Sequence, residues 1–260
     1  MATDPETGDP KTFDADGVRI AYDDVGDGEP VVLVHGFASD RSSNWRATGW
    51  YDALTDAGRR VVAIDCRGHG ESGKPHDPAA YGHETMAEDV VGLLDHLSVE
   101  TADVMGYSMG AAVTVQLLAE HADRFNAVVV AGIGSGVVEG LAGSDLIADA
   151  LEADDVEDVE TDVGRRFRLF AEGNGNDLLA LAAVMRARDA PVDAERLAEV
   201  SLPVLVVAGT EDDLVDDPGN VADLLPNASA VAVEGTDHLT TVGSTRYKEA
   251  VLAFLGREGL

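Results

Sequence analysis

Residues 102–113 contain a Gly-x-Ser-x-Gly motif, from Gly106 to Gly110, that lies between an apolar run and a helical pattern. The run before it has the composition of a buried strand, and the residues after Gly110 are rich in alanine, valine and leucine. Ser108 is therefore predicted to lie at the apex of a strand-to-helix turn, where a nucleophile is exposed. Gly106 and Gly110 carry no side chain that would clash in so tight a turn. The alternative is a glycine-flanked loop, and the flanking strand and helix patterns favour the nucleophile.

Apolar runs of strand composition alternate with helical patterns along most of the chain. A helix between two strands makes them parallel, so the alternation predicts a twisted, mostly parallel sheet with helices on both faces. About eight strands are expected, at 12–15, 17–23, 30–36, 60–66, 103–107, 127–133, 203–208 and 228–233. The expected helices of this α/β core are 42–59, 84–97, 109–121, 218–225 and 245–255.

The alternation stops for roughly sixty residues, more than a crossover between strands needs. Only helical patterns occur there, at 146–151, 162–171, 177–188 and 193–198. This predicts a helical cap at 137–200 inserted into a core made of 1–136 and 201–260.

The net charge of −31 is the extreme value of the composition, with lysine only at Lys11, Lys74 and Lys248. The acidic residues are spread over the whole chain between apolar periodic runs, which argues against a disordered acidic tail. Such a surface repels nucleic acid and anionic lipid. It is stable where salt screens its self-repulsion. We therefore expect a protein of an extreme halophile, of haloarchaeal type, with neither nucleic acid nor membrane as a partner.

A single cysteine, Cys66, excludes an internal disulfide and fits a reducing compartment. No stretch approaches the roughly 20 apolar residues of a membrane span, and residues 1–16 do not have the pattern of a signal peptide. We expect a cytoplasmic monomer or homodimer.

A serine nucleophile needs a base, and the loops after parallel strands converge on one crevice. Among the seven histidines, His35, His69 and His238 follow strands. His238 comes after the last strand and before the last helix, in a loop that can bring its imidazole over Ser108. His35 is better placed to fix a turn that holds Phe37, and His69 has polar neighbours in its own loop. The remaining histidines are expected at the surface or at helix ends; they are His76, His83, His96 and His121.

The acid that orients this base is expected after the strand at 203–208. Asp212 stands three residues beyond Gly209, and Asp213 is its close competitor. A shift of one residue turns a side chain away, so only one of the two can face the histidine. The order serine, aspartate, histidine favours Asp212.

These motifs together resemble the α/β-hydrolase family over nearly the whole chain. They are His35-Gly36, the loop from Asp65 to Ser72, Gly106-Tyr107-Ser108-Met109-Gly110, Gly209-Thr210-Glu211-Asp212, and His238. The resemblance implies the α/β-hydrolase fold with a cap. It assigns catalysis to Ser108, Asp212 and His238, and the oxyanion hole to the backbone N–H groups of Phe37 and Met109. Thr236-Asp237 departs from the family pattern, and Asp237 is expected to raise the pKa of the base.

The expected activity is hydrolysis of an ester or related acyl bond of a small molecule, through an acyl-enzyme on Ser108. No cofactor and no metal is expected. Lactonase, carbon–carbon bond hydrolase and cofactor-free perhydrolase activities use the same three residues and stay open. A ligand-binding protein on this fold is the alternative of another class.

The substrate-binding walls are expected to include Phe37, Tyr107 and Met109. Four cap residues either join these walls or form the core of the cap; they are Phe167, Leu169, Phe170 and Met185. Arg165, Arg166 and Arg168 form a rare cationic cluster. It is expected to pair with glutamates at 157 or 160, with binding of an anionic substrate as the alternative.

Overall fold

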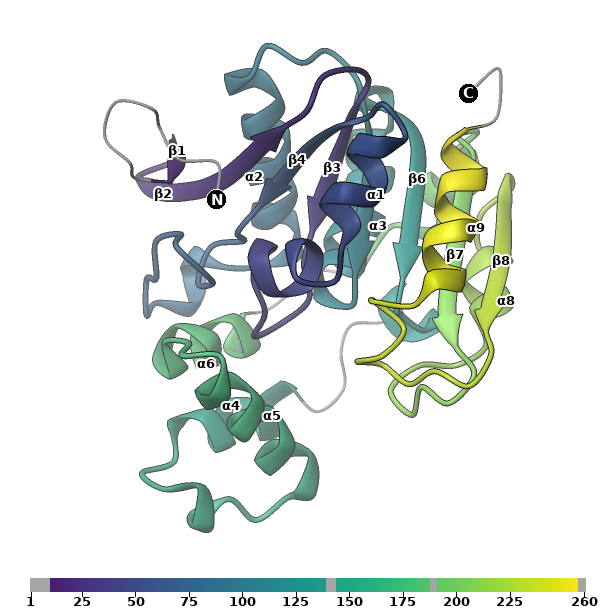
Figure 1. The fold of residues 1–260 in the computed structure, drawn as a ribbon. Coiled ribbons are helices and arrows are strands. Elements are labelled where there is room, and N and C mark those ends of the chain that lie inside the picture. The colour runs from purple at the N-terminus through teal and green to yellow at the C-terminus, as the bar shows by residue number, and fades with distance from the viewer. Residues whose placement is uncertain (1–9, 139–143, 188–190, 257–260) are drawn as a thin grey trace.

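The computed structural model describes residues 10–138, 144–187 and 191–256. Within these ranges one sheet of eight strands lies between two layers of helices, and a further group of helices lies beyond the ends of the strands (Figure 1). None of the helices in these ranges has the length and apolar character needed to cross a membrane.

The strand order in the sheet is β1-β2-β4-β3-β5-β6-β7-β8. The two first strands pair antiparallel with their neighbours, and the other pairs are parallel. The bounds are β1 (Lys11–Ala15), β2 (Val18–Val25), β3 (Pro30–Val34), β4 (Arg60–Ile64), β5 (Ala102–Tyr107), β6 (Phe125–Ala131), β7 (Val204–Gly209) and β8 (Ala228–Val233). The predicted α/β fold with its mostly parallel sheet is confirmed, including the edge strand expected at 12–15.

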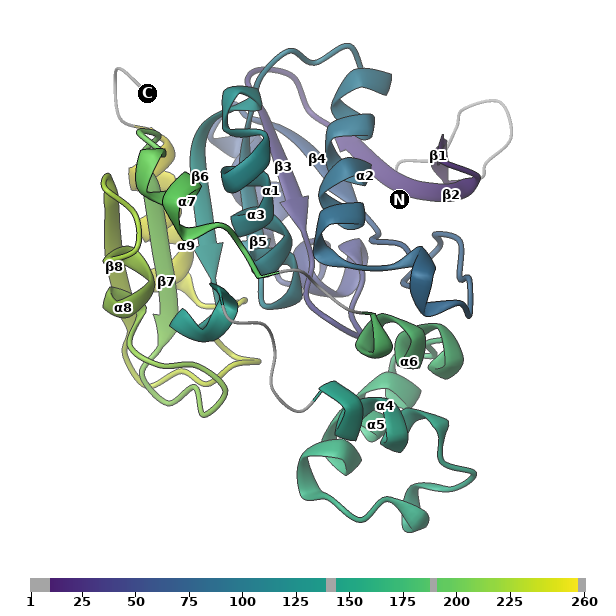
Figure 2. The same ribbon diagram turned by 180° about the vertical axis from the view of Figure 1, so that it is seen from behind.

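Two layers of helices cover the faces of this sheet. Helices α1 (Trp50–Asp56) and α9 (Thr245–Leu255) lie on the face turned toward the viewer in Figure 1. Helices α2 (His83–His96), α3 (Met109–Glu120) and α8 (Pro218–Ala222) lie on the face seen in Figure 2.

The alternation of side chains along each strand creates the two hydrophobic cores. In β3, Val31 and Leu33 belong to the cluster that contains Trp50, whereas Val32 and Val34 belong to the cluster on the other face. Successive residues of a strand point to opposite faces. An unbroken apolar run is therefore what a strand covered by helices on both sides requires.

The group of helices beyond the sheet comes from the predicted cap. It comprises α4 (Ser144–Glu152), α5 (Asp162–Gly173) and α6 (Leu178–Arg186), which lie at the carboxyl ends of the parallel strands (Figures 1 and 2). Helix α7 (Ala194–Glu199) packs instead against α3. Residues 139–143 and 188–190 of the predicted cap lie outside the described ranges.

Acidic and hydroxyl side chains begin the cap helices. The hydroxyl of Thr161 accepts a hydrogen bond from the N–H of Gly164 (3.2 Å), and Asp177 accepts one from Ala180 (3.0 Å). These oxygens satisfy backbone donors that have no partner inside a helix. Part of the acidic composition therefore serves local structure as well as surface charge.

The continuous helix expected at 42–59 is wrong. The chain forms one π-helical turn at Ser42–Arg46, and the α-helix starts only at Trp50. Gly49 between them has a φ of 79°, in the left-handed region that glycine tolerates. The apolar pattern of this segment marks burial on both sides of the break, which periodicity alone does not reveal.

Candidate active site

Ser108 lies between β5 and α3 with φ 55° and ψ −115°, a backbone conformation unusual for a residue other than glycine. The turn is packed too closely for side chains on either side of it. A Cβ atom on Gly106 would lie 2.1 Å from the carbonyl oxygen of Gly110. One on Gly110 would lie 2.1 Å from the carbonyl oxygen of Val34. The two glycines therefore allow β5, α3 and β3 to approach one another around the serine.

Gly106→Ala is expected to lower the free energy of unfolding by about 3 kcal/mol, because the backbone of α3 must move to admit the methyl group. Gly173→Ala is the matched control, since a Cβ there meets nothing within 4 Å. Its effect is expected to stay below about 1 kcal/mol. Urea unfolding at constant salt measures both values, and equal stabilities would contradict the tight packing at Gly106.

The three residues expected to carry catalysis lie in hydrogen-bond contact. The hydroxyl of Ser108 is 3.0 Å from Nε2 of His238, and Nδ1 of His238 is 2.8 Å from Oδ2 of Asp212. The hydroxyl of Tyr107 donates to the backbone oxygen of His238 (2.6 Å) and so holds the histidine loop over the serine. The serine comes from the end of β5, the aspartate from the loop after β7 and the histidine from the loop after β8.

The two candidate aspartates have different environments. The side chain of Asp212 is fully buried, and its second oxygen accepts a hydrogen bond from the N–H of Leu214 (3.0 Å). The side chain of Asp213 is 65% exposed and lies 3.3 Å from Arg166. Of the two, Asp212 contacts His238.

Asp237 forms local hydrogen bonds within the turn that precedes His238. Its Oδ1 accepts hydrogen bonds from the N–H groups of Leu239 (3.0 Å) and Thr240 (2.8 Å) and from the Thr240 hydroxyl (2.6 Å). The Thr240 hydroxyl bond is the main cause that lowers the pKa of the Asp237 carboxyl. This carboxylate therefore shapes the histidine loop.

The loop after β3 lies next to the serine. The N–H of Gly36 donates to Oδ1 of Asn44 (3.2 Å), and a Cβ on Gly36 would lie 3.3 Å from Cβ of Ser108. Met109 is the first residue of α3, so its N–H has no acceptor within the helix. The backbone N–H groups of Met109 and of Phe37, which follows Gly36, belong to the two segments that flank the serine.

His35 and His69 both contact this loop. Nδ1 of His35 donates to the oxygen of Gly36 (2.8 Å), and its Nε2 accepts from the N–H of Cys66 (3.0 Å). His69 donates to the backbone oxygen of Arg67 (3.0 Å), and its ring contacts Phe37 edge-on, with 5.7 Å between centroids. Burial lowers the pKa of His35, and it lowers that of His69 to about 3. Both rings are therefore neutral parts of the structure.

A cavity of about 340 Å³ opens above Ser108. Its polar lining comes from the segment after β3, and its apolar lining comes largely from α5 and from the loops after β7 and β8. The polar side includes Ser39, Ser43, Asn44 and Thr48; the apolar side includes Val163, Phe167, Phe170, Leu214, Leu239 and Val242. The site can hold a small ligand with an apolar group.

The expected wall residues fall into two groups. Phe37 and Tyr107 line the cavity, whereas the Met109 side chain is buried in the core and is absent from the described lining. In the cap, Phe167 and Phe170 line the cavity, Met185 is buried in the core, and Leu169 is 51% exposed. The helical pattern identifies apolar positions, but the side of α5 that faces the site depends on how the cap docks.

The cationic cluster of α5 separates into different roles. Arg168 donates to Glu172 (2.6 Å) and to three backbone carbonyls at the end of α4 and just beyond it, and Arg165 donates to the carbonyl of Val159 (2.7 Å). Arg166 lines the cavity. Within the described ranges, Arg166 pairs with Asp213 and Arg168 pairs with Glu172. Neither ion pair involves Glu157 or Glu160, the partners expected from the sequence.

The sequence left several lining residues unassigned, notably Asn44, Asn174 and Leu239. Asn44 lies ten residues after the end of β3, in the segment that also carries Phe37, which is a positional signal. Asn174 lies at the far end of the cap helix α5, and no sequence pattern connects it with the serine.

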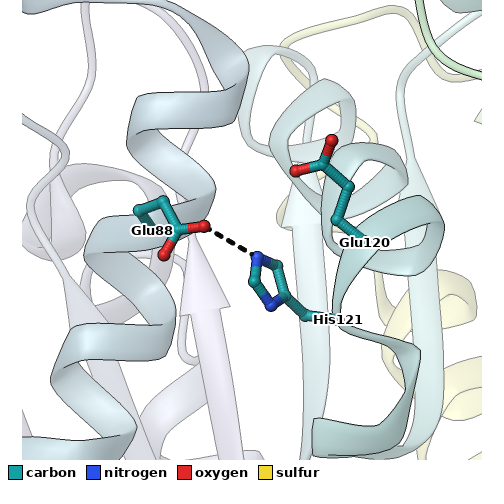
Figure 3. A group of neighbouring side chains, drawn as sticks. All are labelled: Glu88, Glu120 and His121. Carbon is teal, nitrogen blue, oxygen red and sulfur yellow. Dashed lines mark hydrogen bonds and ion pairs between the residues drawn. The ribbon is translucent and has the colours of Figure 1, made fainter.

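Glu88, Glu120 and His121 form a group of possible metal ligands, with ligand atoms within 4.8 Å of one another (Figure 3). Nε2 of His121 lies 2.9 Å from Glu88. The group joins α2 to the last turn of α3, whereas Ser108 precedes the first turn. The length of α3 puts about 18 Å between them. A cation bound there would not reach the serine.

Comparison with known proteins agrees with this architecture. The family described as alpha/beta hydrolase fold matches residues 29–181. The non-heme chloroperoxidase CPO-A1 of Kitasatospora aureofaciens is 28% identical over 93% of this chain and 98% of its own.

Two solved structures are similar over almost the full length. A hydrolase from Pseudomonas aeruginosa PA01 has a TM-score of 0.79 at 26% identity, covering 96% of this chain and 100% of its own. The enol-lactonase from Burkholderia xenovorans LB400 has a TM-score of 0.74 at 26% identity, covering 95% and 100%. The chain therefore belongs to the alpha/beta hydrolase fold family and is a hydrolase of that fold.

Proposed function

We propose that the protein is a serine hydrolase that cleaves an ester or related acyl bond of a small molecule through an acyl-enzyme on Ser108. The observation that carries the proposal is the continuous chain of contacts from the Ser108 hydroxyl to His238 (3.0 Å) and from His238 to Asp212 (2.8 Å). A serine hydroxyl becomes a useful nucleophile when a base is within hydrogen-bond reach and a third group orients that base.

In the first half of the reaction, Oγ of Ser108 attacks the carbonyl carbon while Nε2 of His238 accepts the hydroxyl proton. Asp212 accepts the hydrogen bond from Nδ1 and stabilises the imidazolium that forms. The tetrahedral intermediate collapses when the bond to the leaving oxygen breaks and His238 returns the proton to that oxygen. Water then repeats the sequence on the acyl-enzyme and releases the acid.

The negative charge of both tetrahedral intermediates falls on the former carbonyl oxygen. The N–H groups of Phe37 and Met109 flank Ser108 and are proposed to donate to it. Met109 also begins α3, so the positive end of the helix dipole faces the same place. Such preorganised donors commonly make the largest single contribution to acyl transfer.

The cavity favours a compact acyl or alcohol group that packs against Phe167, Phe170 and Leu239. Lactones are the second candidate substrates. They carry the same scissile bond within a ring, and the similar structure from Burkholderia xenovorans is an enol-lactonase.

The proposal is tested by treating the protein with a fluorophosphonate probe in about 2–4 M KCl, a range that screens a strongly acidic surface. Mass spectrometry is expected to locate the adduct on Ser108, and Ser108→Ala is expected to give none. A panel of p-nitrophenyl esters and lactones then ranks the substrates. Absence of both adduct and turnover would favour a ligand-binding role instead.

A further inference from the structure

Two side-chain amides of the cap converge on one carbonyl of the loop after β3. Nδ2 of Asn174 donates to the oxygen of Ala38 at 3.1 Å, and Nδ2 of Asn176 donates to the same oxygen at 2.8 Å. We call Asn174 and Asn176 the cap amide pair. Both residues lie in the turn that follows α5, more than 130 residues away from Ala38 in sequence.

The acceptor of these bonds is itself an unusual residue. Ala38 has a φ of 56°, in the left-handed region that alanine disfavours, and its side chain is fully buried. It lies in a tight turn closed by the hydrogen bond from the N–H of Ser39 to the oxygen of Gly36 (3.2 Å). A backbone held in such a region needs surrounding contacts to keep it there. The cap amide pair supplies two of them.

The same turn contains Phe37, whose N–H is one of the two donors proposed for the oxyanion. The Phe37 ring also contacts Phe167 of α5, with 5.9 Å between centroids. We call residues 36–39 the oxyanion loop. Helix α5 and the turn that follows it contact this loop at two points, through the Phe167 ring and through the cap amide pair. These contacts tie the orientation of the Phe37 peptide to the position of the cap.

The amides are in turn fixed by the end of α5. The N–H of Asn174 donates to the oxygen of Phe170 (3.2 Å), and the N–H of Asn176 donates to that of Ala171 (3.1 Å), with Gly175 between them at φ 67°. Phe170 also lines the cavity. A ligand that packs against α5 thus contacts the helix that carries the cap amide pair.

From this geometry we infer that Asn174 and Asn176 are positioning residues that orient the Phe37 N–H for the oxyanion when the cap is docked. The inference rests on the proposed acyl hydrolysis. It makes the oxyanion hole dependent on the cap. A cap displaced from Ala38 leaves the serine, histidine and aspartate in contact while one oxyanion donor loses its support.

The test is the double variant Asn174→Ala/Asn176→Ala, assayed on p-nitrophenyl butyrate in molar KCl. We expect kcat to fall about 10- to 100-fold while KM changes less than about twofold, because the lost contribution belongs to the transition state. The inhibition constant of a phenylboronic acid, whose tetrahedral adduct places an oxygen in the oxyanion hole, should rise by a similar factor. Binding of butyrate, which forms no such adduct, should not change.

Asn227→Ala is the matched control, because the Asn227 amide donates to the backbone oxygen of Ser201 (3.0 Å) at an exposed position outside the cavity lining. It is expected to keep the wild-type kcat, and thermal unfolding checks that all variants are folded. A rise in KM at constant kcat would overturn the inference, since the pair would then serve only to close the cap. Unchanged kinetics would also overturn it. Turnover by the wild-type protein separates the two proposals. If the wild-type protein does not hydrolyse esters, the proposed function fails as well. If it does and the double variant behaves in either of these ways, only the positioning role of Asn174 and Asn176 is rejected.

Discussion

Replacing Asp212 by asparagine is expected to lower kcat for ester hydrolysis about 10⁴-fold with little change in KM. Asparagine fills the same volume, but its amide nitrogen cannot accept the hydrogen bond that Nδ1 of His238 donates over 2.8 Å. The imidazole then favours the tautomer with its proton on Nε2. That nitrogen faces the Ser108 hydroxyl and can no longer accept its proton.

Asp213→Asn is the matched control for this experiment. The change of charge is identical and the position is the adjacent one, yet the Asp213 side chain is 65% exposed and pairs with Arg166. Its effect on kcat is expected to stay within about twofold, since exposed pairs contribute little. Steady-state kinetics in molar KCl compare the two variants. Similar losses in both would assign the effect to general electrostatics and would reject the orienting role of Asp212.

The fold was predictable because its determinants are local in the sequence. An apolar run such as the one at 30–34 requires cover on both faces, and the glycines beside Ser108 allow a turn that other residues would obstruct. The same local patterns place the candidate catalytic residues in loops that directly follow strands. It brings Ser108, Asp212 and His238 to one edge of the sheet, where the structure places them in contact.

What the sequence did not reveal depends on contacts between distant segments. The break at Gly49 interrupts an apolar pattern that continues on both sides of it. The amides of Asn174 and Asn176 look like ordinary turn residues until the cap is docked on Ala38. In each case the residue type permits the conformation, but only the tertiary structure selects it.

The buried charges of the core are a further example. A chain of net charge −31 suggests acids at the surface, yet Asp23 and Asp65 are almost completely buried. Both lie beside Arg41, which is itself only 4% exposed. Nε of Arg41 is 3.3 Å from Asp23, and its two terminal nitrogens bind Asp65 and Glu71. The backbone N–H of Arg41, three residues after Ala38, also donates to Asp65 (2.8 Å), so the cluster holds the segment that continues from Phe37 and Ala38.

Arg41→Met is therefore expected to lower the free energy of unfolding by about 3–5 kcal/mol at neutral pH, the usual cost of leaving a buried charge without its partner. Asp65 carries the larger share, because Asp23 keeps its ion pair with Arg46 (2.8 Å) when Arg41 is replaced. Burial raises the pKa of the Asp65 carboxyl, and the positive charge of Arg41 counteracts this rise. Without Arg41 the pKa rises further. The deficit is then present above that raised pKa and should shrink as the pH falls through it, because the carboxyl takes up a proton there.

Urea unfolding at constant molar KCl measures these free energies, and Arg196→Met provides the control. Arg196 pairs with Asp193 over 3.8 Å, and the two side chains are 57% and 55% exposed, so removing this pair should cost less than about 1 kcal/mol. Adding Asp65→Asn to Arg41→Met should recover part of the lost stability at neutral pH, since the unpaired charge is then absent. If the double variant is no more stable than Arg41→Met, the loss comes from packing of the arginine stem and not from the buried carboxylate. Recovery would instead show that the ion pair between Arg41 and Asp65 is what stabilises this region next to the oxyanion loop.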